Sequence, residues 1–91
     1  MVEPKIHIVL QRRDRARNVA RFYVLAIEPS LYGYGVLVRA WGRIGSLSRQ
    51  SLDLYASAGE TSETLEAWLA RKVGRGYAPV VSTVNFQPER P

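Results

Sequence analysis

The residues best suited to chemistry in this chain lie in one short stretch, Ala40-Trp41-Gly42-Arg43-Ile44-Gly45. If the stretch is a strand, Arg39, Trp41 and Arg43 share one side, because successive side chains alternate between faces. An indole beside guanidinium groups suits stacking on a base or sugar and contact with phosphate. Gly42 would let a ligand or another backbone approach closely. The structural alternative is a core tryptophan flanked by solvent-reaching arginines, followed by a bend.

A second group of basic residues precedes this stretch. Four arginines fall within six positions and are opposed by Asp14 alone: Arg12, Arg13, Arg15 and Arg17. Such a run is commonly a solvated loop or strand end. Beside an aromatic surface, the same run would contact phosphate groups. The charge pattern leaves both interpretations open.

The composition favours an anionic partner and limits the available chemistry. The net charge is +5, and eleven of the thirteen basic residues are arginine, which is typical of binding to nucleic acid or to acidic protein surfaces. The absence of cysteine excludes disulfides, zinc–thiolate sites and thiol chemistry. The lone histidine, His7, argues against a transition-metal site. We therefore expect neither a cofactor nor a metal.

The sequence lacks a set of residues that would carry catalysis. His7 lies in an apolar run with nothing to pair with, and Glu60, Glu63 and Glu66 fit one turn of a helix start, where acidic side chains are favoured. The glycines match no dinucleotide or phosphate-loop pattern. We predict that the protein is not an enzyme. No apolar run approaches the roughly 20 residues of a membrane span and no secretion signal is evident, so we expect a cytoplasmic protein without a membrane partner.

Alternating apolar residues predict several strands. In the first, Ile6, Ile8 and Leu10 share one face and His7 points to the other. The second and third are expected to pair as an antiparallel hairpin after a turn at 29–33. The predicted strands cover 5–10, 21–28, 34–43 and part of 46–57, and a fifth, edge strand is expected within 77–86.

One amphipathic helix follows these strands. Leu65, Trp68, Leu69 and Val73 are spaced as one apolar stripe, which predicts that Trp68 belongs to the core. Thr61 or Ser62 is the expected N-cap. Gly74 or Gly76 is expected to end the helix.

These elements predict a single small α+β domain, a twisted antiparallel sheet of four or five strands packed by one C-terminal helix. A sheet covered on one side leaves its other face for solvent or a ligand. Alternation alone does not settle which face is covered. We expect Trp41, Arg39 and Arg43 on the uncovered face or at its rim.

An ordered set of motifs resembles a known family. Trp-Gly-Arg-Ile-Gly at 41–45 is preceded by Arg21-Phe22-Tyr23 and Leu31-Tyr32-Gly33 and followed by Arg75-Gly76-Tyr77. Together these are similar to the WGR domain, a small module of the DNA-damage-activated poly(ADP-ribose) polymerases and of short bacterial proteins. The resemblance covers about residues 5–80, with 1–4 and 87–91 as loose termini.

The resemblance implies binding to DNA near a strand break. By position, Trp41 would pack on the sugar of a terminal nucleotide, with Gly42 giving close approach, and Arg43 would couple DNA contact to neighbouring domains. Tyr77 and Asn18 are implied as phosphate contacts. The chain departs from the family at Gly35 and Ser48, where tryptophan and glycine are common. The other polymerase domains do not accompany the module, so no transferase activity is implied and Arg43 has no neighbouring domain to couple to.

Two functions follow from these observations. The first is a non-catalytic module that contacts DNA ends, nicks or the sugar-phosphate backbone without strong sequence preference, through Arg39 and the residues named above. The second is a protein-interaction module whose same aromatic and basic face binds an acidic partner or a second copy, since such residues are also favoured at protein interfaces. Steep salt dependence distinguishes the first from the second.

Overall fold

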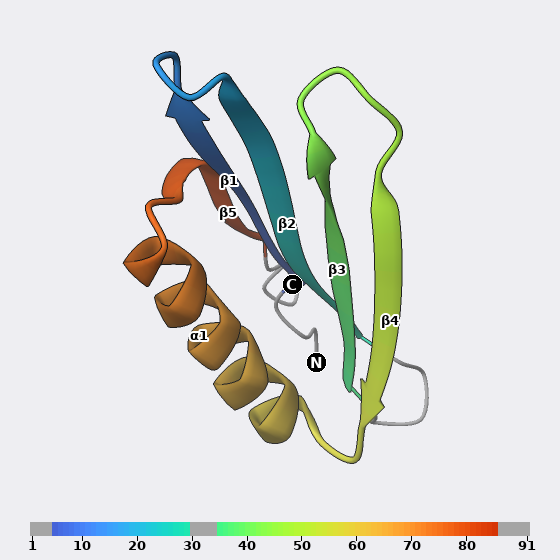
Figure 1. The fold of residues 1–91 in the computed structure, drawn as a ribbon. Coiled ribbons are helices and arrows are strands. Elements are labelled where there is room, and N and C mark those ends of the chain that lie inside the picture. The colour runs from blue at the N-terminus through green and yellow to red at the C-terminus, as the bar shows by residue number, and fades with distance from the viewer. Residues whose placement is uncertain (1–4, 30–34, 86–91) are drawn as a thin grey trace.

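The protein folds into one antiparallel sheet with a helix against one face (Figure 1). The computed structural model describes residues 5–29 and 35–85, with side chains for 6–28 and 35–80. The strand order is β4-β3-β2-β1-β5. The elements are β1 (Lys5–Asp14), β2 (Val19–Pro29), β3 (Gly35–Arg43), β4 (Arg49–Tyr55), helix α1 (Ala58–Gly74) and β5 (Ala78–Asn85). The predicted α+β architecture is confirmed, and the fifth strand forms at the edge beside β1.

The expected hairpin of the second and third strands is confirmed by their antiparallel register, in which Tyr23 pairs with Trp41. Pro29, the first residue of the predicted turn at 29–33, is the last residue of β2. The rest of that turn, Tyr34 and the termini 1–4 and 87–91 lie outside the described residues. β1 is longer than predicted, because its alternation continues through Arg12 and Arg13 to Asp14. The turn to β2 is Arg15–Asn18, where Asn18 has a φ of 54°. Asparagine tolerates this left-handed conformation better than most residues.

The core lies between the sheet and α1. Its buried apolar side chains come from three strands and the helix: Ile8, Leu10, Tyr23, Leu25, Ile27, Leu37 and Leu65. The predicted inward face of β1 is confirmed, and His7 is exposed on the other side. Of the predicted helical stripe, Leu65 is buried, but Trp68 is half-buried and Val73 is 48% exposed. No helix among the described residues is long and apolar enough to cross a membrane.

The helix begins one turn earlier than predicted. Ser57, not Thr61 or Ser62, is the N-cap, and its Oγ accepts a hydrogen bond from the Glu60 amide at 3.2 Å. Glu60 Oε2 accepts in turn from the Ala56 amide at 3.1 Å. Ser57 and Glu60 thus follow the Ser-x-x-Glu spacing of a capping box. Thr61 is instead completely buried against the glycine that opens β3, Gly35.

The helix ends at Gly74, the first of the two predicted glycines, and the second, Gly76, belongs to the C-terminal cap that follows. The Gly76 amide donates to Val73 O at 3.0 Å, and the Tyr77 amide donates to Lys72 O at 3.1 Å. Gly76 has a φ of +97°. These two hydrogen bonds form a Schellman motif, which satisfies carbonyls that the helix end would leave unpaired. The motif turns the chain so that the Tyr77 ring returns toward the core, where it packs against buried residues.

Candidate nucleic-acid interface

The register of the sheet brings the predicted basic and aromatic residues to one end of the face that α1 packs on. Arg12 of β1, Arg21 of β2 and Arg43 of β3 are register partners and form one row across the sheet. In the next row, Tyr23 of β2 lies between Leu10 and Trp41, and Trp41 pairs with Arg49 of β4. Like charges placed directly opposite one another destabilise a sheet. A row of three arginines therefore indicates a surface suited to an anion.

This placement corrects one expectation from the sequence. Trp41, Arg39 and Arg43 do not lie on the uncovered face or at its rim. They share the side of Leu37, which is fully buried in the core beneath α1. The physical reason is that both faces of the strands carry apolar side chains, α1 covers the face of Leu10, Leu25 and Leu37, and Arg39, Trp41 and Arg43 alternate in phase with Leu37.

Four rings form an aromatic cluster at this end of the sheet: Tyr23, Trp41, Trp68 and Tyr77. Tyr23 is 3% exposed and lies at the centre. It stacks on Trp41 with centroids 5.9 Å apart and on Trp68 at 6.1 Å, and it meets Tyr77 edge-on at 6.3 Å. Trp41 is half-buried, so its indole is both anchored on the core and open to solvent. Its predicted roles as core aromatic and as stacking surface are thus compatible.

Arg39 lies inside this cluster. Its guanidinium carbon is 4.3 Å from the Trp68 ring centroid and 5.6 Å from that of Trp41. It donates hydrogen bonds to Tyr23 Oη at 3.1 Å and Ser51 Oγ at 3.1 Å, and it pairs with Asp53 at 3.4 Å. Burial by itself would lower the pKa of Arg39, but Tyr23 and Asp53 outweigh it and raise the pKa. The side chain is 16% exposed and holds the cluster together.

The Trp-Gly-Arg residues line an open hollow of about 380 Å³. Its wall combines one tryptophan with three arginines, and its residues are Arg21, Trp41, Gly42, Arg43, Leu47 and Arg49. A planar apolar surface ringed by arginines matches a sugar or base with its attached phosphates. Arg21 and Arg49 are not among the site residues predicted from the sequence. Register is the signal that finds them, because both occupy the rows of Trp41 and Arg43.

Gly42 lies close to other groups of the protein itself, the Leu47 backbone and the Phe22 ring. A Cβ at this position would lie 3.2 Å from Leu47 O and 3.4 Å from Phe22 Cε1. Any side chain would therefore push the β3–β4 loop away from the sheet. Gly42 keeps Leu47 in the wall of the hollow.

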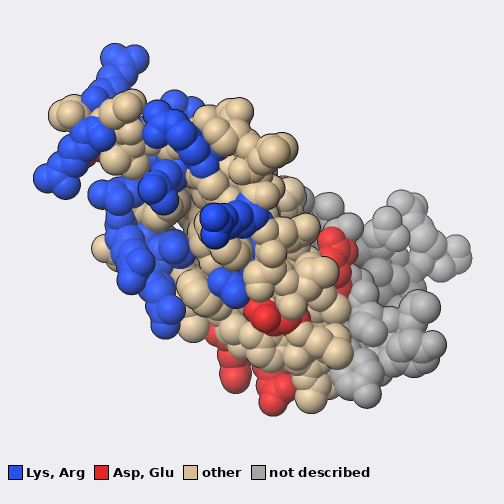
Figure 2. All heavy atoms as spheres, turned by 45° about the vertical axis from the view of Figure 1, so that its right-hand side comes forward, with Lys and Arg blue, Asp and Glu red and all other residues tan. Residues whose placement is uncertain are grey.

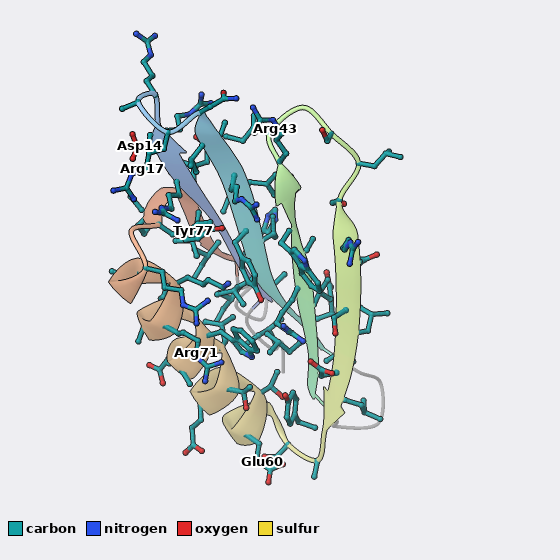
Figure 3. The ribbon with its side chains drawn as sticks, in the orientation of Figure 1. Asp14, Arg17, Arg43, Glu60, Arg71 and Tyr77 are labelled. Atoms are coloured by element: carbon teal, nitrogen blue, oxygen red, sulfur yellow. The ribbon has the colours of Figure 1, made fainter. Side chains whose placement is uncertain are left out.

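Arg43 connects the hollow to the β1–β2 turn. Its guanidinium donates to the backbone carbonyl and to the side-chain oxygen of Asn18, both at 3.3 Å. The arginine remains exposed and sits at the end of β3 (Figure 3). Asn18 thereby fixes the direction of the Arg43 side chain.

Lys72 belongs to this surface, although it is not among the site residues predicted from the sequence. Its Nζ lies 4.4 Å from the Tyr23 ring centroid and 5.5 Å from that of Tyr77. Burial lowers the pKa of Lys72, and the charges of Arg75, Arg71, Arg39 and Arg21 lower it further. A cation in the field of four others is a strong site for an anion. Helical spacing would have found it, since Lys72 follows Trp68 by four residues.

The remaining predicted site residues are divided. Arg12 lies on the helix-packed face, with its side chain close to Gly76, and Tyr77 joins the aromatic cluster. Arg13 points to the opposite face and donates to Gln11 at 3.3 Å. Arg15 is exposed in the turn, and Arg17 pairs with Asp14 at 3.7 Å, as Figure 3 shows. Within the described residues, no three His, Asp or Glu side chains gather in a way that would hold a metal ion.

Charge is unevenly distributed over the whole molecule. Figure 2 shows lysine and arginine side chains gathered at one end and acidic side chains toward the other. Arg43 and Tyr77 lie toward the basic end, and Glu60 lies at the opposite end (Figure 3). The hollow and Lys72 therefore occupy the part of the surface with the most positive potential.

Comparison with known proteins agrees with this geometry. The chain is 33% identical over 79 residues to the "Uncharacterized protein y4dW" of Sinorhizobium fredii (strain NBRC 101917 / NGR234). The match includes 87% of this chain and spans 39% of the length of that curated relative. No solved structure matches the chain. The family model described as "WGR domain" matches residues 6–84, which include all of the described strands and helix except the end residues Lys5 and Asn85, and the chain therefore belongs to the WGR domain family.

Proposed function

We propose that this protein is a non-catalytic module that binds DNA at ends, at nicks or along the sugar-phosphate backbone. Membership of the WGR family, a family of non-catalytic modules, supports nucleic-acid binding in general. The observation that carries the finer proposal is the hollow in which Trp41 lies among Arg21, Arg43 and Arg49. Three arginines around one half-buried indole suit a nucleotide whose sugar is accessible and whose phosphates lie on either side.

An accessible sugar and base are features of a strand end. Inside an intact duplex the bases are stacked on one another, so an indole makes the least contact with them there. It makes the most contact at a terminus or a nick, where a sugar or base is free. In this proposal Trp41 packs on the terminal sugar and the neighbouring arginines bind the phosphates. Lys72 and Tyr77 provide a second phosphate contact beside the aromatic cluster. Arg39 supports the indoles from within and does not itself reach the DNA.

The proposal includes no sequence preference. Reading base edges requires an element that enters a groove, most often a helix. The helix here is a poor candidate, because Glu63 and Glu66 are exposed along its outer side and would be repelled by phosphate. Contact to sugar and phosphate positions a protein on DNA without specifying a sequence.

The test is fluorescence-anisotropy titration of a nicked, 5′-phosphorylated duplex against an intact duplex closed by hairpins, at two salt concentrations. Trp41→Ala and Arg43→Ala are measured beside Arg13→Ala, which removes the same charge from the opposite face. We expect tighter, salt-sensitive binding to the broken duplex, lost in Trp41→Ala and Arg43→Ala but kept in Arg13→Ala. Circular dichroism checks that each variant is folded.

Equal binding to both duplexes would overturn the preference for ends and leave backbone binding. No binding to any DNA at moderate salt would overturn DNA binding altogether. The same aromatic and basic surface would then be tested for an acidic protein partner, which arginine and aromatic residues also suit.

A further inference from the structure

The sheet face opposite α1 is apolar across its centre. On it lie Phe22 and Val24 of β2, Val36 and Val38 of β3, and Leu52 and Leu54 of β4. Leu52 is 65% exposed and Leu54 is 66% exposed. None of these six side chains is charged, and α1 packs on the other face. The face therefore differs in kind from the basic surface that the proposed function uses.

The apolar residues form one continuous patch because they occupy adjacent rows. Val24 pairs with Ala40, the next row runs from Ala26 through Val38 to Leu52, and Val36 pairs with Leu54. Strands lie about 4.8 Å apart with about 3.3 Å per residue, so the patch covers about 400 Å² before side-chain relief is counted. A monomeric protein rarely exposes a contiguous apolar patch of more than a few hundred Å².

We propose that two copies of this chain pack against each other through this open face. Two such faces bury about 800 Å² in total before side-chain relief is counted, which is the size of a weak, concentration-dependent interface. The centre of this face carries no charged side chain, and Glu28 lies at its end, in the row of Val36 and Leu54. Such a face matches a second sheet face as in a β-sandwich, where two sheets pack about 10 Å apart. Neither copy has to bury a charge at the centre.

The charge distribution selects the relative orientation. Each copy has a basic end near Arg43 and an acidic end near Glu60 (Figure 3). A two-fold axis that crosses the strands sets the copies antiparallel, so that each basic end lies over the acidic end of its partner. The same axis places β4 over β4 of the partner. Leu52 and Leu54, the most exposed residues of the patch, then meet their counterparts, and the two hollows point away from each other.

Sedimentation velocity of the full chain over a series from micromolar to millimolar concentration tests this pairing. We expect a monomer–dimer equilibrium for the wild-type protein. Leu52→Glu places like charges across the axis and is expected to weaken dimerisation by about tenfold or more, because an unpaired charge would be buried. The matched control is Leu47→Glu, which changes a leucine that is 97% exposed in the β3–β4 loop and is expected to leave the dimer intact.

An equimolar mixture of Leu52→Glu and Leu52→Lys tests the orientation, since opposite charges across the axis are expected to restore a mixed dimer. Thermal unfolding checks that the variants are folded, and Leu54→Thr, a change to a residue that suits strands, repeats the test without a charge. A monomer at every concentration would overturn the proposal and indicate that the patch binds another protein. A dimer that Leu52→Glu and Leu54→Thr leave unchanged would also overturn it. DNA binding is measured separately, because the hollow lies on the other side of the sheet.

Discussion

At the scale of single residues, the most informative side chain is Arg39. A free arginine two positions before Trp41 would be an obvious phosphate contact. This one is bound by Tyr23, Ser51 and Asp53 and lies against two indoles. Its Nε is buried without a hydrogen-bond partner within the described structure. The structural role of Arg39 therefore depends on its planar guanidinium, which stacks on the two indoles and donates hydrogen bonds to its polar neighbours.

We predict that Arg39→Met destabilises the protein by about 2 kcal/mol, because several hydrogen bonds to a charged group and its stacking on tryptophan are lost. Arg39→Lys is expected to restore little, since an ammonium cannot bridge Tyr23, Ser51 and Asp53 while lying flat between rings. Urea unfolding followed by tryptophan fluorescence measures the change. Arg13→Met on the exposed side is the control. A loss no larger than that of the control would show that the Arg39 contacts contribute nothing net.

Lys72 gives a prediction about pH. Its pKa in the folded protein lies below the ordinary 10.5, so folding disfavours the ammonium. The charge therefore costs stability at pH values below the folded pKa, and the cost disappears as the pH rises through that pKa to 10.5. Lys72→Met is expected to be more stable than wild type at neutral pH, with the difference shrinking toward high pH. Paired urea titrations at several pH values measure it.

Stability and binding move in opposite directions for this residue if the proposed function holds. Lys72→Met is expected to bind a 5′-phosphorylated duplex more weakly while being more stable. A bound phosphate favours the ammonium and raises the pKa of Lys72, so wild-type binding takes up protons at pH values near and above the pKa of the free folded protein. Binding measured in two buffers of different ionisation enthalpy detects this uptake. An unchanged affinity in the variant would remove Lys72 from the interface.

At the scale of the elements, the joint between α1 and β3 depends on one glycine. A Cβ at Gly35 would lie 2.7 Å from Thr61 Cβ and 3.1 Å from Ser57 O. Both are groups of the first helical turn and its cap, so the helix start rests directly on the backbone of β3. The absence of a side chain at Gly35 is what lets the cap at Ser57 form where it does.

We predict that Gly35→Ala destabilises the protein by about 2–4 kcal/mol, because the helix start must move away from the sheet. Gly59→Ala is the matched control in the same helix turn. Its Cβ would lie 3.8 Å from Ser57 Oγ, an ordinary contact, and alanine suits a helix better than glycine by about 1 kcal/mol. The two variants are therefore expected to shift the urea midpoint in opposite directions. A neutral Gly35→Ala would contradict this account of the joint.

At the scale of the whole molecule, separation of charge accounts for where an anion binds. The basic end combines strand ends of β1 to β4 with the end of α1, and acidic residues lie at the other end (Figure 2). The separated charges give the molecule a dipole in addition to its net positive charge, and both attract and orient DNA at long range. The net charge of +5 indicates that the protein attracts anions, but it does not indicate where on the surface they bind.

This predicts a difference in salt dependence between two arginines of equal charge. Arg49→Ala removes a wall of the hollow and is expected to lower the slope of log affinity against log salt by about 1, the value for one lost phosphate contact. Arg13→Ala, on the other face, is expected to leave the slope unchanged. Anisotropy titrations of one duplex at several salt concentrations measure both. Equal slopes for the two variants would indicate binding by net charge alone.

Much of the fold could be predicted because it is encoded locally. Alternating side chains identify the strands, the spacing of Leu65 and Trp68 identifies the helix, and Gly76 marks its end. The helix start was missed because Gly59 breaks the pattern that precedes it, although Ser57 and Glu60 carry the spacing of a capping box. Of the site, Trp41 and Arg43 could be found from their own motif and Lys72 from its helical spacing to Trp68, whereas Arg21 and Arg49 could not be found without the register.

The sequence by itself determined the elements, the basic character of the protein and the shared side of Arg39, Trp41 and Arg43, because each depends on chemistry within a few residues. The tertiary structure alone decided which side of the sheet α1 covers, since both sides are apolar and alternation treats them alike. It also decided that Arg39 is enclosed while Arg21 and Arg49 join the hollow. Those outcomes depend on register between strands that are distant in the chain, which fixes neighbours that no local pattern records.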